Sequence, residues 1–272
     1  MLINYHIYGL ISDFQVCSVV LETPHQIAGG IMKLSVLIAI LLLSFNSIAQ
    51  DIYLNDYNFT VSDVARRGYS KEAIFQNLDR KLVKIGKSIC SNRALVWARQ
   101  MEQQFGVSSA KVFLFYSEKT GEVGDKTWWY HVAPMVNENG NLWVVDAGFP
   151  KFVRRPLTRD EWLKKFAGSN NCKELQSEDE ALIQNMFTMQ RFPSQTPAGN
   201  FDCYYRVVSA PYWTPRTVAL NMLGRNERGE PVNFSRERFN ESELMLACLE
   251  VARSGGIFGS SRKKRCRKFL GL

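Results

Sequence analysis

The sequence lacks the motifs of several large protein classes. It has no Cys and His spacing typical of a zinc site, no Gly-rich loop that could hold a phosphate, and no aromatic strand of the kind that binds RNA. It also has no internal repeat and no low-complexity linker. The formal charge of +8 attracts anionic partners through the long-range field, but without a recognition module we expect no nucleic-acid partner.

A long apolar segment is also missing. Residues 34–43 are almost wholly apolar, but a bilayer span takes about 20 such residues. Lys33 precedes this run and Ser47-Ile48-Ala49 follows it, which is the pattern of a cleaved export signal. We therefore predict a signal peptide over residues 32–49, cleavage after Ala49, and a secreted or periplasmic mature protein without a permanent membrane span.

The predicted signal divides the chain into two unequal parts. Residues 1–31 fit no pattern of a cleaved leader, so we expect them to be an upstream artefact, with translation starting at Met32. The part after the signal is long enough for one sizeable core, because 46% of the sequence is hydrophobic. We predict a single catalytic domain over residues 50–272, with a core at about 85–150 and a helical C-terminal extension over 151–272.

The order of the expected elements is helix, then sheet, then more helix, which is an α+β fold. Helices are expected where apolar residues recur at three- and four-residue steps, and strands where aromatic and β-branched residues alternate. The last dozen residues, rich in Lys and Arg, are expected to be a solvated basic end. The expected helices are Lys71 to Ile85, Ser91 to Phe105, Thr158 to Phe166, Glu178 to Met189 and Asn240 to Arg253. The expected strands are Lys111 to Tyr116, Trp128 to Val136, Leu142 to Phe149 and Tyr204 to Ser209.

The predicted mature protein has an odd number of cysteines, because only Cys17 lies upstream of the cut. If Cys90 is a reactive free thiol, the other four can form two disulfides, which agrees with export. The pairing of Cys172 with Cys203 and of Cys248 with Cys266 closes short local loops and is preferred. Four cysteines allow three pairings, and the other two remain open.

Cys90 is the candidate nucleophile. A cysteine attacks a carbonyl as the thiolate, and a helix N-terminus favours the thiolate through its partial positive charge and free N–H groups. The same N–H groups could receive the oxyanion of acyl transfer. His131 is the candidate base, because the other two histidines, His6 and His25, lie upstream of the predicted cut.

A hairpin turn at Asn139-Gly140 connects His131 to a candidate carboxylate. Asn-Gly is the strongest short hairpin signal, and a turn centred on it places Ala133 opposite Asp146. Side chains alternate along a strand, so His131 shares the face of Ala133 and becomes a diagonal neighbour of Asp146. A shift of the strand register by one residue would place the two side chains on opposite faces of the sheet. We predict that Asp146 orients the imidazole and stabilises its protonated form.

Aromatic side chains next to His131 are candidates for the substrate cleft. Trp129 and Tyr130 directly precede His131, and alternation places Trp129 on the face of His131. We expect Trp129 and Tyr130 to bind substrate, while core packing is the alternative.

Three segments carry a resemblance to a known family: Ser88-Ile89-Cys90-Ser91-Asn92-Arg93-Ala94, Trp129-Tyr130-His131-Val132-Ala133-Pro134 and Val144-Val145-Asp146. Together they resemble the protein-glutaminase family, secreted bacterial enzymes that deamidate protein-bound glutamine and whose core is similar to that of transglutaminases. The most specific part is His-Val-Ala-Pro after tryptophan, with aspartate on the next strand. The resemblance spans Cys90 to Phe149.

The resemblance implies a fold, an activity and a set of site residues. The fold would be transglutaminase-like, with the helix that bears the nucleophile packed on an antiparallel sheet and additional helices towards the C-terminus. The activity would be hydrolysis of glutamine side chains in proteins or peptides, with Cys90, His131 and Asp146 as catalytic triad and no metal or organic cofactor. A pro-region or inhibitor that blocks the cleft is a further expected partner.

Two other functional interpretations of the same residues remain open. A transglutaminase, or a cysteine peptidase that cuts the main chain, would use the same acyl-enzyme, so the triad does not separate them from a deamidase. A non-enzymatic binding module of the cell envelope, stapled by disulfides, would not need a reactive thiol at neutral pH.

Overall fold

The structure is a computed structural model that describes residues 49–80, 90–117, 129–176, 178–189, 195–196, 199–211, 215–223, 225, 244–245, 247–249 and 259–271. The chain divides into residues 1–47 and residues 48–272, and all of the described residues lie in the second unit. The predicted upstream segment and all but the last residue of the predicted signal peptide lie outside the described residues.

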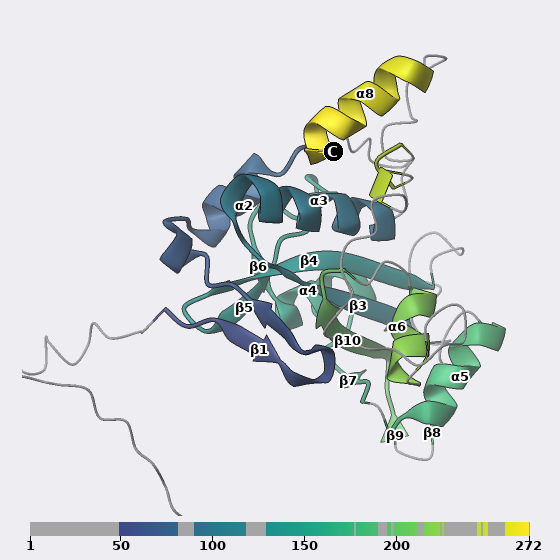
Figure 1. Ribbon diagram of the computed structural model, residues 1–272. Helices are drawn as coiled ribbons and strands as arrows, with labels where there is room; N and C mark the ends of the chain where they lie inside the picture. The colour runs from purple at the N-terminus through teal and green to yellow at the C-terminus, as the bar shows by residue number, and fades with distance from the viewer. Residues whose placement is uncertain are drawn as a thin grey trace, which may run out of the picture. The chain divides into compact units, whose positions relative to one another are not determined.

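Six strands form the main sheet (Figure 1), and in chain order they are β3 (Ala110–Tyr116), β4 (Tyr130–Glu138), β5 (Asn141–Val144), β6 (Leu157–Thr158), β7 (Cys172–Glu174) and β10 (Cys203–Ser209). Their order across the sheet is β6-β5-β4-β3-β10-β7. All neighbours are antiparallel except β7 and β10, which are parallel. Every residue of β3 is buried, because layers cover both faces of the sheet at this strand.

Helices cover the sheet from both sides. They are α2 (Lys71–Asn77), α3 (Cys90–Phe105), α4 (Arg159–Ala167), α5 (Glu180–Met189) and α6 (Pro215–Met222). A further helix, α8 (Gly259–Leu270), packs on α3. Trp162 of α4 packs in one cluster with Leu114 of β3, whereas α5 and α6 pack in another cluster with Phe113. Because successive side chains of β3 point to opposite faces, these clusters mark the two sides of the sheet.

The shorter elements pack at the edges of this arrangement. The pair of strands β1 and β2 encloses a 3-10 turn, and Tyr57 of that turn joins the cluster that contains Phe113. These elements are β1 (Ile52–Leu54), η1 (Asn55–Tyr57), β2 (Phe59–Val61), η2 (Ala65–Arg67), β8 (Gln195–Thr196) and β9 (Gly199–Asn200).

The elements around the candidate site agree with the sequence-based expectations, and the α+β fold class is confirmed. The predicted second helix is α3, which ends where Gly106 adopts a positive φ of 62°. Asn139 and Gly140 have φ values of 55° and 77°, as a type I′ turn requires, and they join β4 to β5 in the expected register. Tyr204 to Ser209 lies within β10, and Thr158 caps α4 through a capping box with Glu161.

Two predicted elements are shorter in the structure. Of the helix predicted over Lys71 to Ile85, the structure has Lys71–Asn77 as a helix and Leu78 as extended, while residues 81–85 lie outside the described residues. The strand predicted to reach Phe149 ends at Val144, because the chain leaves the sheet in a turn in which the Ala147 N–H donates to the Val145 carbonyl. Of the helix predicted over 240–253, residues 244–245 and 247–249 are helical and the rest lie outside the described residues.

The expectation of a helical C-terminal extension is wrong in one respect. The part of the chain after Pro150 also supplies β6, β7 and β10, and β10 pairs with the central strand β3 along its whole length. The sequence pattern within one segment could not predict this strand pairing, because pairing between strands that are about 90 residues apart depends on the tertiary fold. The C-terminal half is therefore part of the core rather than an addition to it.

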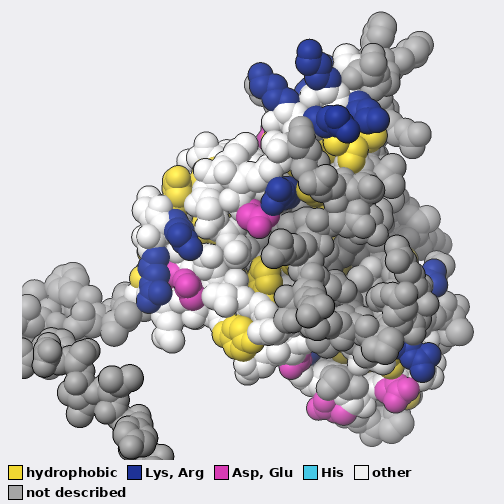
Figure 2. Space-filling view, in the orientation of Figure 1, with side chains coloured by type: hydrophobic (Ala, Val, Ile, Leu, Met, Phe, Trp, Pro, Cys, Tyr) yellow, Lys and Arg dark blue, Asp and Glu magenta, His cyan; other side chains and the backbone are white. Residues whose placement is uncertain are grey.

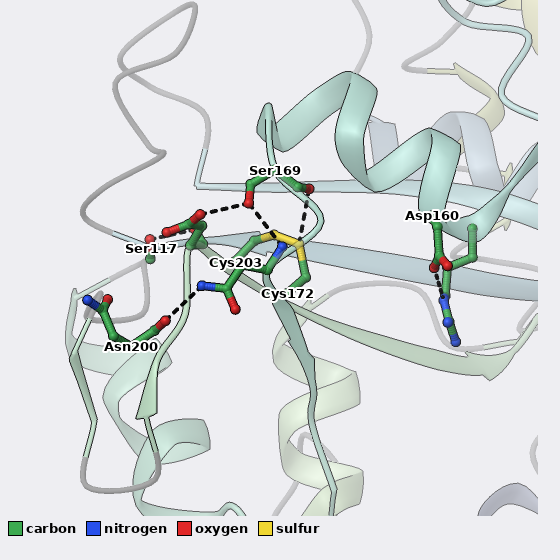
Figure 3. Close-up of a disulfide and its surroundings, with 9 residues drawn as sticks. Ser117, Asp160, Ser169, Cys172, Asn200 and Cys203 are labelled. Carbon is green, nitrogen blue, oxygen red and sulfur yellow. Dashed lines mark hydrogen bonds and ion pairs between the residues drawn. A yellow bond between two sulfur atoms is a disulfide. The ribbon is translucent and has the colours of Figure 1, made fainter.

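Two disulfides tie this half of the chain together, and they are the preferred pairs. Cys172 and Cys203 are register partners on β7 and β10, with a Cα–Cα distance of 4.4 Å (Figure 3). Hydrogen bonds surround this disulfide, including one that the Ser169 hydroxyl donates to the Asp202 carboxylate at 2.7 Å. Cys248 and Cys266 form the second pair.

The basic C-terminal end is helical, which corrects the expectation of a merely solvated tail. Its last turns are tied to the fold by the buried Cys266 and Leu270, which pack against Leu95 and Val96 of α3. Five Lys and Arg side chains of α8 are exposed, and Figure 2 shows basic side chains gathered over this helix; the five are Lys263, Lys264, Arg265, Arg267 and Lys268. In the part of the chain that the structure describes, no helix is both long and apolar enough to cross a bilayer.

Candidate active site

Cys90 is the first residue of α3 and is 6% exposed. It is the one described cysteine that is not in a disulfide. Its side chain lies in the cluster that contains Ala94 of the same helix and Val132 of β4. The first N–H groups of a helix have no partner within the helix, so the sulfur lies where backbone donors and the positive end of the helix dipole are found.

His131 and Asp146 form a buried pair next to the end of β5. The last bond of the β4–β5 ladder runs from the Val145 N–H to the Pro134 carbonyl at 2.9 Å, and the chain then turns away. This turn leaves the Asp146 carboxylate diagonal to the imidazole, and His131 Nε2 lies 2.7 Å from Asp146 Oδ2. The register inferred from the hairpin turn therefore brings these two side chains together.

Two further donors hold the Asp146 carboxylate in place. Trp162 Nε1 of α4 donates to Oδ2 at 3.0 Å, and the Gly148 N–H donates to Oδ1 at 3.3 Å. A buried carboxylate needs such donors, because burial without them would favour its neutral form. Sequence reasoning missed Trp162, although the capping box that starts α4 was recognisable.

Aromatic rings enclose the imidazole of His131. Trp162 stacks on it at a centroid distance of 5.2 Å, while Phe166 and Phe149 lie at 4.5 Å and 5.3 Å. These rings restrict rotation of the imidazole and exclude water from it. Low local polarity strengthens the interaction between His131 and Asp146.

The electrostatics of the three groups favour their charged forms. Burial opposes ionisation of Cys90, but a hydrogen bond and the charge of His131 outweigh it and lower the pKa of the thiol. Burial also lowers the pKa of His131, whereas the charge of Asp146 raises it, with a net pKa of about 9. The pKa of Asp146 is lowered by His131 against the effect of burial. These shifts favour a thiolate, an imidazolium and a carboxylate over the neutral forms of the three groups.

The two ring nitrogens of His131 face different groups. Nε2 donates to the Asp146 carboxylate at 2.7 Å, which leaves Nδ1 as the nitrogen that can exchange a proton with Cys90. In the serine-protease triad the two nitrogens have the opposite assignment. Which nitrogen carries out proton transfer is set by the hydrogen bond of the other one.

Tyr130 and Trp129 lie beside Cys90 rather than beside Asp146. The Tyr130 hydroxyl is 3.1 Å from the Ser91 hydroxyl, and burial and the nearby charge of Cys90 raise the pKa of Tyr130. The Trp129 ring packs edge-on against Tyr130 at 4.9 Å, in the cluster of Cys90. Strand β4 begins only at Tyr130, so the expected alternation does not extend to Trp129, which packs on the side of Tyr130 and not with His131.

A separate cavity lies outside this cluster. This cavity of about 380 Å³ is lined by Trp143, Arg159 and Val207 among others, and by none of Cys90, His131 and Asp146. Among the described residues, no group of three His, Cys, Asp or Glu side chains could hold a metal ion.

The chain is thus an α+β protein with a buried thiol, imidazole and carboxylate cluster between a helix start and a sheet. Residues 73–166, which contain this cluster, match the family model Gln_deamidase_2, described as glutaminase. The match confirms the resemblance to the protein-glutaminase family over this segment and supports an enzyme that deamidates glutamine. The NMR structure of protein-glutaminase from Chryseobacterium proteolyticum is similar with 14% identity and a TM-score of 0.37, over 74% of this chain and 92% of that chain. No curated protein matches the chain.

Proposed function

We propose that residues 50–272 form a single catalytic domain that deamidates glutamine side chains of proteins through a thioester. The observation that carries this proposal is the Cys90, His131 and Asp146 cluster, which lies inside the segment that matches the glutaminase family. The contact of α3 with the antiparallel strand β4 supports a transglutaminase-like arrangement.

The first half of the reaction forms the thioester. The Cys90 thiolate attacks the carboxamide carbon, a C–S bond forms, and the carbonyl oxygen becomes an oxyanion that N–H groups at the start of α3 can stabilise. The oxyanion then collapses and the C–N bond breaks. The His131 imidazolium gives its proton to the departing nitrogen, which leaves as ammonia, and His131 becomes neutral.

The second half restores the enzyme. Neutral His131 takes a proton from water, and the resulting hydroxide adds to the thioester carbon. When this intermediate collapses, the C–S bond breaks and Cys90 leaves as the thiolate beside the imidazolium. The product is a glutamic acid side chain, which loses its proton to solvent and becomes glutamate. Asp146 keeps the ring oriented and stabilises its charge throughout.

Trp129 and Tyr130 would control the access of substrate to Cys90. Cys90 is nearly buried, so a carboxamide reaches the sulfur only after the side chains beside it move. Trp129 and Tyr130 are both partly exposed and both lie in the cluster of Cys90. We therefore propose that these two side chains bind the substrate side chain at the entrance.

The proposal is tested with a glutamine-containing protein as substrate. We expect ammonia release together with a mass increase at glutamine residues and no change in chain length. Isopeptide cross-links would instead show a transglutaminase, and new N-termini would show a peptidase. If neither ammonia nor any modified product forms, the result would favour the non-enzymatic binding module with its two disulfides.

We also propose that the mature protein is exported. The two disulfides support this, because disulfides persist mainly outside the cytosol. N-terminal sequencing of the protein produced from the full-length chain is the test, and we expect the mature protein to begin at Gln50. A protein that retains residues 32–49 would contradict the proposed cleavage.

A further inference from the structure

Arg93 is a buried cation in the first turn of α3. It is 3% exposed and lies three residues after Cys90, so the two side chains share one face of the helix. Its guanidinium extends to the turn that follows β5. Arg93 Cζ lies 5.3 Å from the centroid of the Phe149 ring, as in a cation–π contact.

Gly148 provides the space that the guanidinium occupies. A Cβ atom built on Gly148 would lie 2.9 Å from Arg93 Nε and 3.4 Å from Asp146 Oδ1. The φ angle of Gly148 lies outside the left-handed range, so its backbone conformation does not require glycine. The close approach of Arg93 therefore explains why this position carries no side chain.

The charges of the cluster show why a cation is needed here. With Cys90 ionised, the cluster has two negative groups, Cys90 and Asp146, and one positive group, His131, so its net charge is negative. A buried net charge is costly unless another charge or hydrogen bonds compensate it. Arginine stays protonated at any ordinary pH, and the charge of Arg93 lowers the pKa of both Cys90 and Asp146.

We propose that Arg93 is a positioning residue, whose guanidinium, seated against Gly148 and Phe149, holds the turn with Asp146 against α3 and balances the negative charge of the cluster. Its effect on turnover rests on the proposed function, whereas its effect on Cys90 does not. Arg93 acts through Cys90 and Asp146 and needs no contact with substrate.

The test follows the ionisation of Cys90 directly. Five groups act on the Cys90 charge or respond to it: Arg93 from α3, His131 and Tyr130 from β4, Tyr116 from β3 and, through His131, Asp146. The readout is the ultraviolet absorbance of the thiolate as a function of pH, taken as the difference between each protein and the same protein carrying Cys90→Ala. This subtraction removes the signal of tyrosines that do not sense Cys90, while burial raises the pKa of Tyr116 and Tyr130, so that they ionise above the range in which the thiolate forms. The measurement does not require a reagent to reach the buried sulfur.

In Arg93→Met we expect the midpoint of thiolate formation to rise by at least about one pH unit, because a nearby opposite charge is lost. Arg93→Lys should recover most of this shift, since it keeps the charge but not the planar group that lies over Phe149. Arg99→Met is the matched control on the same helix. Arg99 pairs with Glu102 at the surface, and its loss should leave the midpoint unchanged.

Gly148→Ala gives a second, independent measurement of the effect of Arg93 on thiolate formation if Arg93→Met does not fold. The added methyl group displaces the guanidinium while the charge stays in the chain, so we expect a smaller upward shift of the same midpoint. An unchanged midpoint in folded Arg93→Met, or in Gly148→Ala where Arg93→Met is unfolded, would overturn the proposal. Because the readout needs no substrate, a chain that releases no ammonia but shows the shift would contradict the proposed function alone.

Discussion

Replacing Cys90 by alanine is expected to reduce ammonia release from a glutamine-containing protein to the background of the assay. The proposed thioester forms on the sulfur, and no other group in the cluster can take its place. Removing the nucleophile leaves only the rate that binding and the oxyanion donors supply. The measurement is ammonia release together with the mass of the substrate protein, for the wild type and the variant at equal concentration.

Cys90→Ser is the informative companion to this variant. Serine has nearly the shape of cysteine, but its hydroxyl does not ionise in the range where His131 is charged, so we expect the activity to be lost as well. Both variants should unfold at temperatures close to that of the wild type, because the change in volume at the helix start is small. Deamidation by folded Cys90→Ala at the wild-type rate would show that the cysteine is not the nucleophile.

The second large effect is expected for Asp146→Asn, which should lower kcat by a factor on the order of 10⁴, the size found for the corresponding change in serine proteases. Asp146 is the main reason that the pKa of buried His131 rises to about 9. Without its charge, burial is the largest remaining effect on that pKa and lowers it, so we expect Cys90 and His131 to form a neutral pair at neutral pH. The pH profile of kcat/KM should therefore lose its high-pH limb near 9.

Asp160→Asn is the control for this variant. Asp160 is an exposed aspartate on α4 that pairs with Arg159, so its substitution removes the same charge outside the cluster. We expect its kcat and pH profile to match the wild type. A loss of activity in Asp160→Asn equal to that in Asp146→Asn would point to a general effect of net charge and contradict the role assigned to Asp146.

Local signals near the candidate site were informative because they constrain the backbone directly. The Asn139-Gly140 pair needs positive φ at both positions, and this sets the register of β4 and β5 within a few residues of His131. A shift of this register by one residue would have placed His131 and Asp146 on opposite faces of the sheet. The start and end of α3 were equally readable, since apolar periodicity and Gly106 mark them.

Contacts between distant segments could not be inferred in the same way. Trp162 follows Asp146 by 16 residues and reaches the carboxylate only because α4 folds back over the sheet. Nothing in the sequence near Cys90 shows that Arg93 would meet Gly148, because that contact joins the start of a helix to a turn beyond β5. The pairing of β10 with β3 likewise joins segments that are distant in the sequence.

By itself, the sequence determined the α+β class, the Asn-Gly hairpin register, the helix that begins at Cys90 and the preferred disulfide pairs, because each of these depends on short-range backbone preferences or on loop length. Only the tertiary structure decided how α4 and the C-terminal strands join the core, and how Trp162, Arg93 and Gly148 surround the buried cluster. The physical reason is that burial and charge balance depend on side chains that meet in space, and local preferences do not specify which distant segments will meet.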